Sequence, residues 1–292
     1  MKNKTVEHLL YAHKVDMGGF PVRQPLPTQA IEQHDPFLLL HHARVKISGG
    51  RKQKETGIGP HPHRGFAPVT FVFEGAVHHR DSRGNDRVVE AGGVQWTEVG
   101  MGIIHSERPT KELAQKGGYQ EIIQLWVNTP AEKKMLEPSY FPVSKEDMPE
   151  LTSEDKLVKS RLVVGNLSGH HGPVQSRRDV MAAMIEFEAG GTEKFEIPEG
   201  HNSSIYFLNG EFSISGYGLV EEINMALLST DGELLSVSAK TKGNALLISG
   251  KPLNEPLATH GPFVMNSQTE IMEAMRDYQM GKLGVLIEEF ED

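Results

Sequence analysis

The chain has 292 residues and a formal net charge of −9, and this negative balance argues against general binding to nucleic acids or anionic membranes. Cysteine is absent, which excludes disulfides, thiolate nucleophiles and cysteine-based metal sites. A hydrophobic fraction of 38% is typical of a globular protein with a substantial core, and the length favours two domains of about 150 residues each.

The N-terminal residues indicate where the protein resides. They combine charged side chains with histidine where a signal peptide has an apolar core. The longest apolar runs along the chain are also far too short to span a bilayer. We therefore expect a soluble, cytoplasmic protein.

Short strand-like runs dominate the chain before residue 260. They are separated by Gly, Pro, Asn and Asp at roughly regular intervals, and the clearest are Val69–Phe73, Ile122–Val127, Arg161–Val164, Met181–Phe187 and Ser204–Leu208. Evenly spaced short strands with turn signals between them are typical of barrels and sandwiches. The predicted fold class is therefore all-β.

Two features divide this pattern into halves. The segment Ala131–Lys156 is rich in Lys, Glu, Pro and Ser and has little periodicity, so we place the connection there and predict domains at 1–150 and 151–292. The run Phe71–Gly75 resembles Tyr206–Gly210, because both are apolar strands that lead into a glycine turn. This weak repeat favours a duplicated β-barrel.

The C-terminus has a different pattern. Ser267 and Glu270 have the spacing of a capping box, and the apolar side chains of Ile271, Met275 and Tyr278 follow at helical intervals. A glycine at position 281 offers a stop. The spacing predicts one amphipathic helix over about 268–280, which docks on a barrel.

Two pairs of side chains point to a metal site. His61 and His63 are separated by one residue, as are His105 and Glu107. Residues i and i+2 of a strand share a face, so each pair can converge on one point. Three imidazoles and one carboxylate suit a redox-active transition metal, whereas a structural zinc site usually contains Cys.

Longer motifs around these pairs resemble those of a known family. The chain is similar to the pirins, which form a bicupin branch of the cupin superfamily, in stretches that run from near the N-terminus to the last helix: Asp35–Leu40, His61–Phe66, Glu74–Gly75, His79–Ser82, Val94–Trp96, Gly102–Glu107, Gln124–Asn128 and His260–Asn266. The resemblance implies two stacked cupin barrels of the double-stranded β-helix, jelly-roll-like type, with a C-terminal helix.

The resemblance also implies a metal and its ligands. The N-terminal barrel, 1–150, should bind one mononuclear transition metal through His61, His63, His105 and Glu107. We expect Fe(II), with Cu, Ni, Co, Mn and Zn as alternatives. The C-terminal barrel, 151–292, has no His-x-His and is expected to bind no metal. Pirins usually carry Glu at the position of Ala67, so this chain lacks one source of support for the ligands.

Several other polar and aromatic residues receive structural interpretations. The neighbours in each of the pairs His41–His42, His78–His79 and His170–His171 point to opposite faces of a strand, so we expect turn or surface roles for most of them. We interpret Trp96 and Trp126 as core residues and Arg64 as part of a structural ion pair.

Several pirins are quercetin 2,3-dioxygenases, and the resemblance implies that activity here. A flavonol and dioxygen would be the substrates, with Glu107 as the general base that removes the flavonol 3-hydroxyl proton. Two alternatives remain. The protein could be a metal-dependent regulator of transcription or of a partner enzyme through protein contacts, or an enzyme with an unrelated substrate. We expect a monomer without direct nucleic-acid or membrane binding.

Overall fold

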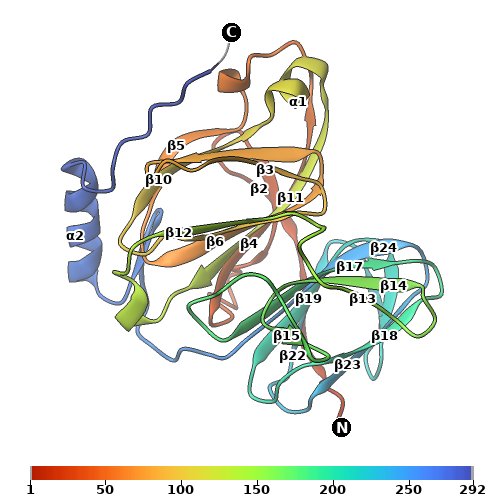
Figure 1. The fold of residues 1–292 in the computed structure, drawn as a ribbon. Helices are drawn as coiled ribbons and strands as arrows, with labels where there is room; N and C mark the ends of the chain where they lie inside the picture. The colour runs from red at the N-terminus through yellow and green to blue at the C-terminus, as the bar shows by residue number, and fades with distance from the viewer. Residues whose placement is uncertain (1, 291–292) are drawn as a thin grey trace. The chain divides into compact units, whose positions relative to one another are not determined.

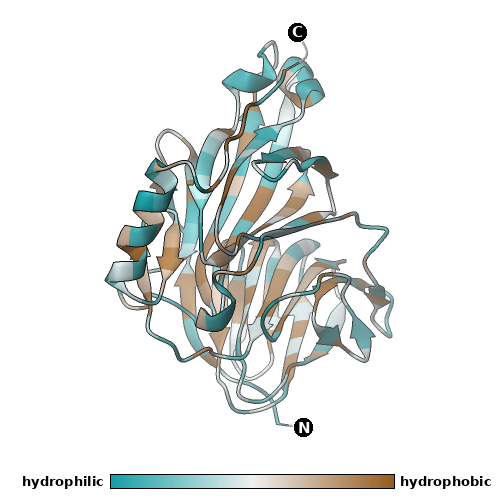
Figure 2. Cartoon of the chain, turned by 60° about the vertical axis from the view of Figure 1, so that its left-hand side comes forward, coloured by the Kyte–Doolittle hydropathy of each residue, from teal (hydrophilic) through white to brown (hydrophobic). Residues whose placement is uncertain are grey.

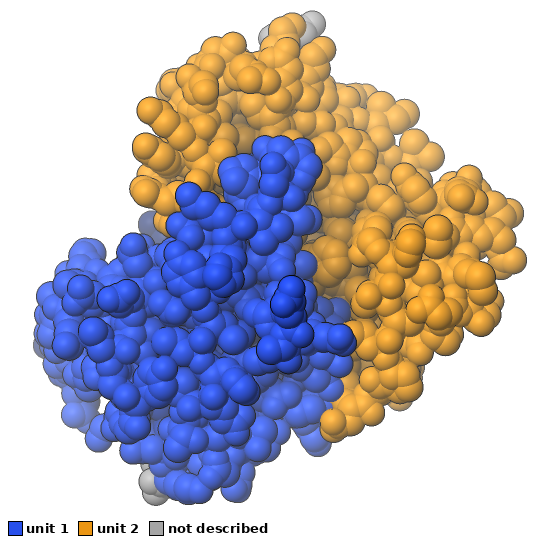
Figure 3. Space-filling view, turned by 180° about the vertical axis from the view of Figure 1, so that it is seen from behind, with its two compact units in different colours: residues 1–42, 145–252 blue, residues 43–144, 253–292 orange. Residues whose placement is uncertain are grey.

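The computed structural model describes residues 2–290 and divides into two compact units. Unit 1 combines residues 1–42 with 145–252, and unit 2 combines residues 43–144 with 253–292 (Figure 3). Each unit is therefore built from two stretches of chain that are distant in sequence.

Unit 2 contains two sheets and the helices of the fold (Figure 1). The smaller sheet has the order β5 (Ile58–His63), β10 (Ile103–Pro109), β7 (Ala76–Asp81) and β8 (Asp86–Glu90). The larger sheet runs β12 (Ser139–Val143), β9 (Val94–Glu98), β6 (Phe66–Glu74), β11 (Gly118–Asn128) and then β4 (Phe37–Ile47), a strand that runs from unit 1 into unit 2. The remaining elements are η1 (Gln53–Glu55), α1 (Lys111–Lys116), η2 (Ala131–Lys133), the hairpin β25 (Ala258–His260) and β26 (Phe263–Met265), and α2 (Gln268–Gln279).

Unit 1 also contains two main sheets. The larger runs β1 (Val6–Tyr11), β22 (Asn224–Leu228), β19 (Asn202–Asn209), β24 (Gly243–Gly250), β17 (Val180–Phe187), β14 (Val158–Val164) and β13 (Glu150–Thr152). The smaller runs β18 (Thr192–Glu196), β23 (Leu234–Ala239), β20 (Glu211–Ile214) and β21 (Gly218–Glu221). The short pairs are β15 (Asn166–Leu167) with β16 (His170–His171), and β2 (His13–Asp16) with β3 (Pro21–Leu26), which pairs with the first half of β4.

The core of unit 1 lies between its two sheets. Phe195, Phe212 and Leu235 of the smaller sheet join Ile205 and Leu247 of the larger sheet in one buried apolar cluster. Alternate residues of each strand face this cluster, and Figure 2 shows brown bands alternating with paler or teal ones along the strands. The all-β prediction is confirmed, and the two-sheet arrangement is that of a cupin barrel.

The weak sequence repeat corresponds to a structural duplication. Strands β5 to β11 of unit 2 and β18 to β24 of unit 1 occupy the same sheet positions in the same order. The two repeated runs lie on the equivalent strands β6 and β19, and each leads into a glycine with positive φ, Gly75 at 76° and Gly210 at 92°. The repeat is therefore the sequence trace of two similar barrels.

The predicted division into contiguous domains differs from the observed units. The chain crosses between units at 42/43, 144/145 and 252/253. The predicted connection, Ala131–Lys156, contains β12 of unit 2 and β13 of unit 1, so it contributes a strand to each. The N-terminal strand β1 pairs with β22 in unit 1, whereas the stretch after residue 252 packs in unit 2.

The predicted C-terminal helix is confirmed as α2. The hydroxyl of Ser267 accepts a hydrogen bond from the backbone N–H of Glu270 at 3.3 Å, which caps the first turn. Ile271 is buried in a cluster with the β25–β26 hairpin and Leu283. Tyr278 is 41% exposed although its ring lies 6.3 Å from that of Phe263 between centroids, and the fully buried Ala274 lies on the packed face. Within the described chain, no helix is long and apolar enough to cross a bilayer.

Candidate metal centre

Three of the predicted ligands converge on the inner face of the smaller sheet of unit 2. In the antiparallel register His105 pairs with His61, and Ile103 pairs with His63, so all three imidazoles share one face. Their candidate ligand nitrogens all lie within 4.8 Å of one another. The Nε2 atoms of His61 and His105 are 2.9 Å apart. This spacing lets the three imidazoles bind a single ion.

Backbone carbonyls orient two of these rings. The Nδ1 atom of His61 is 2.8 Å from the carbonyl oxygen of Gly59, and Nδ1 of His63 is 3.4 Å from that of Pro262. A carbonyl can only accept, so Nδ1 is the donor and the Nε2 lone pair is free for a metal. His105 has a buried Nδ1 atom without a hydrogen-bond partner among the described residues.

Burial keeps two of the imidazoles neutral. The pKa of His63 lies well below its ordinary value because the ring is desolvated and because His61 is close by. The pKa of His105 is lowered in the same way, first by burial and then by the neighbouring imidazoles. Neutral imidazole is the form that binds metals, so the donor set fits a transition-metal ion.

The fourth predicted ligand, Glu107, is anchored beside this group. Its Oε1 atom accepts a hydrogen bond from the Thr70 hydroxyl at 2.7 Å and another from the Gln95 amide, and its Oε2 atom accepts one from the Gln124 amide at 2.8 Å. Glu107 as a residue is 8% exposed. Its oxygens are not members of the group within 4.8 Å, so as a ligand Glu107 stays a prediction.

A second polar layer lies next to Glu107. The Tyr140 hydroxyl donates to Gln95 at 3.2 Å, and the Tyr140 ring stacks on His79 at 4.2 Å between centroids. The His79 Nε2 atom is 3.1 Å from the Asp81 carboxylate. Burial, and then the negative charge of Glu107, raise the pKa of Tyr140, so its hydroxyl stays protonated at neutral pH.

Aromatic side chains close one side of the group. Trp126 is half-buried, with its ring 4.4 Å from Phe66 and 5.5 Å from His63 between centroids. Trp96 is 1% exposed and lies in the core, as expected. Ala67 is fully buried and lies one residue from Phe66 along β6, on the opposite face of the strand. A side chain at position 67 therefore points away from the face that carries Phe66 and Thr70.

The adjacent histidines differ from their predicted surface roles. His41 and His42 are both buried, with Nε2 of His41 2.8 Å from Gln24 and Nδ1 of His42 2.9 Å from the Tyr206 hydroxyl. His79 is fully buried as well. The residues of β4 around His41 and His42 are buried on both faces, so alternation brings neither histidine to solvent, whereas in β7 His78 is half-buried and only His79 is fully buried. The pair His170–His171 is exposed, as expected.

The interpretation of Arg64 agrees with the structure. Its Nη1 atom is 3.1 Å from the Asp277 carboxylate, and its Nε atom donates to the carbonyl oxygen of Met101 at 2.6 Å. Arg64 is 3% exposed, so these contacts compensate a buried charge next to a predicted ligand.

The equivalent positions of unit 1 have no ligand atoms. Strand order and register place Phe195, Ile197, Leu235 and Val237 where unit 2 has His61, His63, His105 and Glu107. The same comparison matches Thr70, Gln95 and Gln124 with Ile205, Ala226 and Leu247. All seven of these unit 1 side chains lack polar atoms, and all seven are buried. Unit 1 thus fills these positions with an apolar core, whereas unit 2 carries a polar site there.

Sequence reasoning missed the residues that anchor the carboxylate. Thr70, Gln95 and Gln124 each stand between two apolar neighbours in the chain, and they pair across β6, β9 and β11. A polar residue inside an apolar strand is an informative signal, because burial without a partner is costly. This signal could have identified the three residues before their common partner was known.

The chain is similar to known proteins over most of its length. Residues 19–127 match the family model described as Pirin, and residues 182–284 match that of the Pirin C-terminal cupin domain. A Pseudomonas aeruginosa protein provisionally named a quercetin 2,3-dioxygenase is 36% identical over 265 residues, which cover 90% of this chain and 92% of that protein.

Two solved structures extend the comparison. The crystal structure of a quercetin 2,3-dioxygenase from Acinetobacter baumannii is 33% identical with a TM-score of 0.91, and the match covers 98% of this chain and 100% of that one. A bacterial pirin from Escherichia coli, solved in complex with nickel(II), shares the fold at 18% identity with a TM-score of 0.66, over 84% of this chain and 99% of that one. The chain belongs to the pirin family of bicupin proteins.

Proposed function

We propose that this pirin-family protein is a metal-dependent dioxygenase of the quercetin 2,3-dioxygenase type. His61, His63, His105 and Glu107 would hold one mononuclear metal, with Fe(II) as the first candidate. The observation that carries the proposal is the convergence of three imidazoles within 4.8 Å beside an anchored carboxylate. The activity named for the Acinetobacter baumannii neighbour supports the substrate class.

The metal, when bound, would supply Lewis acidity and open positions at which substrate and dioxygen can meet. The protein residues determine where those positions lie. The carbonyl oxygens of Gly59 and Pro262 fix the rings of His61 and His63. With Nδ1 protonated in both rings, each Nε2 atom keeps its lone pair and can bind the metal without a change of tautomer.

Glu107 is the proposed proton acceptor for the flavonol 3-hydroxyl. The donors Thr70, Gln95 and Gln124 hold both carboxylate oxygens, so the base is oriented before substrate arrives. The ring of Trp126, next to His63, offers an aromatic face for a flat substrate. Deprotonated flavonol and dioxygen, held side by side, would then give a depside and carbon monoxide.

A turnover assay tests the proposal. Protein loaded anaerobically with ferrous iron is mixed with quercetin in air, and flavonol absorbance and dissolved oxygen are followed. We expect turnover for the wild type and for His170→Ala, which removes an exposed histidine of unit 1. We expect none for His61→Ala. A wild type with an occupied metal site that neither bleaches the flavonol nor consumes oxygen would contradict the proposal.

A further inference from the structure

The last described residues of the chain lie on the outer face of the sheet that carries the predicted ligands. We call residues 281–290 the C-terminal strap. The carbonyl oxygen of Leu283 accepts a hydrogen bond from the Ser82 hydroxyl at 2.7 Å, and Leu283 itself is fully buried. From Gly284 to Phe290 the residues alternate between half-buried and exposed, so one side of the strap faces the protein.

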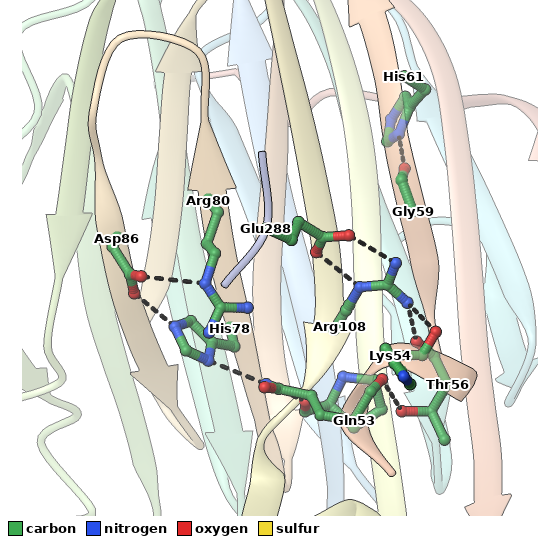
Figure 4. Close-up of polar contacts among 11 residues, drawn as sticks. Gln53, Lys54, Thr56, Gly59, His61, His78, Arg80, Asp86, Arg108 and Glu288 are labelled. Atoms are coloured by element: carbon green, nitrogen blue, oxygen red, sulfur yellow. Dashed lines mark hydrogen bonds and ion pairs between the residues drawn. The ribbon is translucent and has the colours of Figure 1, made fainter. Parts of the chain in front are cut away.

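Glu288 forms the strongest contact of the strap. Its two carboxylate oxygens accept hydrogen bonds from Nε and Nη2 of Arg108, both at 2.7 Å (Figure 4). The side chains of Arg108 and Glu288 are 9% and 7% exposed. A two-point, nearly buried ion pair of this kind fixes the plane of the guanidinium group.

Arg108 extends this contact toward the ligand strand. Its Nη1 atom donates to the carbonyl oxygens of Lys54 at 3.0 Å and Thr56 at 2.8 Å. Its Nη2 atom lies against Gly59, where an added Cβ atom would be only 3.0 Å away. The guanidinium group therefore holds the loop that leads into β5.

Gly59 is the residue that orients His61. Its carbonyl oxygen is 2.8 Å from Nδ1 of that ring, so the path from the strap to a predicted ligand has three contacts: Glu288 to Arg108, Arg108 to the segment Lys54–Gly59 that leads into and begins β5, and Gly59 to His61 (Figure 4). All of these residues belong to unit 2.

An aromatic contact secures the strap beyond Glu288. The ring of Phe290 lies 5.4 Å from the guanidinium carbon of Arg108 and 5.3 Å from that of Arg80. Arg80 in turn donates to the Asp86 carboxylate at 3.0 Å. The strap therefore reaches two neighbouring strands, β10 and β7, and both contacts lie on the outer face of the sheet.

We propose that Glu288 is a positioning residue for the metal centre, which acts through Arg108 and the Gly59 carbonyl on the ring of His61. The inference rests on the proposed metal site. Without the carboxylate, Arg108 remains nearly buried with one fewer partner, and its guanidinium group loses its fixed plane. The start of β5, which carries Gly59, is then held less firmly. His61 becomes free to rotate, so the protein binds the metal more weakly.

The test measures metal binding by the full-length protein and not its activity. Cobalt(II) is the probe, and its dissociation constant is obtained by competition with a chelator, together with the visible spectrum of the bound ion. Glu288→Gln removes the charge from the strap, and Glu288→Asp keeps the charge but shortens the side chain. Glu289→Gln is the matched control, because the neighbouring Glu289 is exposed.

We expect Glu288→Gln to weaken cobalt(II) binding about tenfold and to change the cobalt(II) spectrum. Glu288→Asp should recover part of the affinity, and Glu289→Gln should match the wild type. If Glu288→Gln does not fold, Glu288→Asp must still bind more weakly than Glu289→Gln.

Two results would overturn the inference while the proposed metal site stands. One is equal cobalt(II) affinity and spectrum in the wild type and Glu288→Gln. The other is an equal loss in Glu289→Gln, which would indicate a general effect of charge. A wild type that binds no cobalt(II) would instead overturn the metal site, and the role of Glu288 with it.

Discussion

Gly65 marks a point where two distant stretches of unit 2 meet. It follows the predicted ligand His63 by two residues, and the backbone N–H of Val264 donates to the neighbouring Arg64 carbonyl at 3.0 Å. A Cβ atom on Gly65 would lie 1.9 Å from the Val264 carbonyl oxygen, and the φ angle is +88°. Only glycine fits here, because both the conformation and the space exclude a side chain.

Replacing this glycine should therefore displace the predicted ligand His63. We expect Gly65→Ala to lower the free energy of unfolding by about 2–4 kcal/mol, from the left-handed backbone and from overpacking together. Gly84→Ala is the matched control, because Gly84 has a φ of +87° but nothing within 4 Å of an added Cβ atom.

Urea denaturation of the two variants separates the contributions. Gly84→Ala should lose only about 1–2 kcal/mol, the cost of the backbone conformation alone. Equal losses of unfolding free energy in both variants would show that the contact between Gly65 and the Val264 backbone is not tightly packed.

The convergence of the histidines illustrates what a sequence can predict at this scale. His61 and His63 are two residues apart, and strand geometry alone places them on one face. The partners of Glu107 could not be assigned in this way, because Gln95 and Gln124 come from different strands. Their contact depends on the register between β6, β9 and β11, which a single sequence does not specify.

At the scale of elements, an ion pair ties α2 to the end of β5, the strand that carries the predicted ligands His61 and His63. Arg64 follows β5, and its guanidinium group contacts Asp277 near the end of α2 at 3.1 Å. Lys282 also contacts Asp277, at 2.8 Å, from a more exposed position. The hydrogen bond from Lys282 lowers the pKa of Asp277 most; burial opposes it, and the Arg64 contact adds to the lowering.

This pair should make the docking of α2 sensitive to acid. The folded-state pKa of Asp277 lies below its ordinary value of 3.8, so the pair contributes stability above that value and loses it as pH falls through the folded pKa. We expect Asp277→Asn to cost about 1–3 kcal/mol at neutral pH. The difference from the wild type should shrink below about pH 4.

Chemical denaturation from neutral pH to below about pH 4 measures this difference in unfolding free energy. Lys282→Gln serves as the control. That variant removes only the more exposed partner and should cost less than about 1 kcal/mol. A difference in unfolding free energy between wild type and Asp277→Asn that stays constant down to the lowest pH would contradict a stabilising role for the Asp277 ion pair.

On the scale of the whole molecule, the duplicated barrels could be predicted from the sequence. The repeated crossing of the chain between the two units could not. The strand spacing and the repeat at Phe71 and Tyr206 were sufficient to predict two β-barrels. The membership of residues 253–292 in unit 2 was not predictable, because it depends on long-range contacts. Pro262 orients His63, and Glu288 contacts Arg108, across separations of 199 and 180 residues.

These memberships predict which part of the molecule responds to metal. All predicted ligands lie in unit 2, so binding should stabilise that unit against local opening, by about 2.7 kcal/mol when free metal is 100 times its dissociation constant.

Hydrogen exchange with and without metal should therefore show added protection in β5, β10 and the stretch after residue 252. Strands β18 and β23 of unit 1 occupy the equivalent positions but carry apolar residues, and their local exchange should not change. Equal protection in both units would mean that they open only together, and protection absent after residue 252 would contradict its role in supporting the ligand strand.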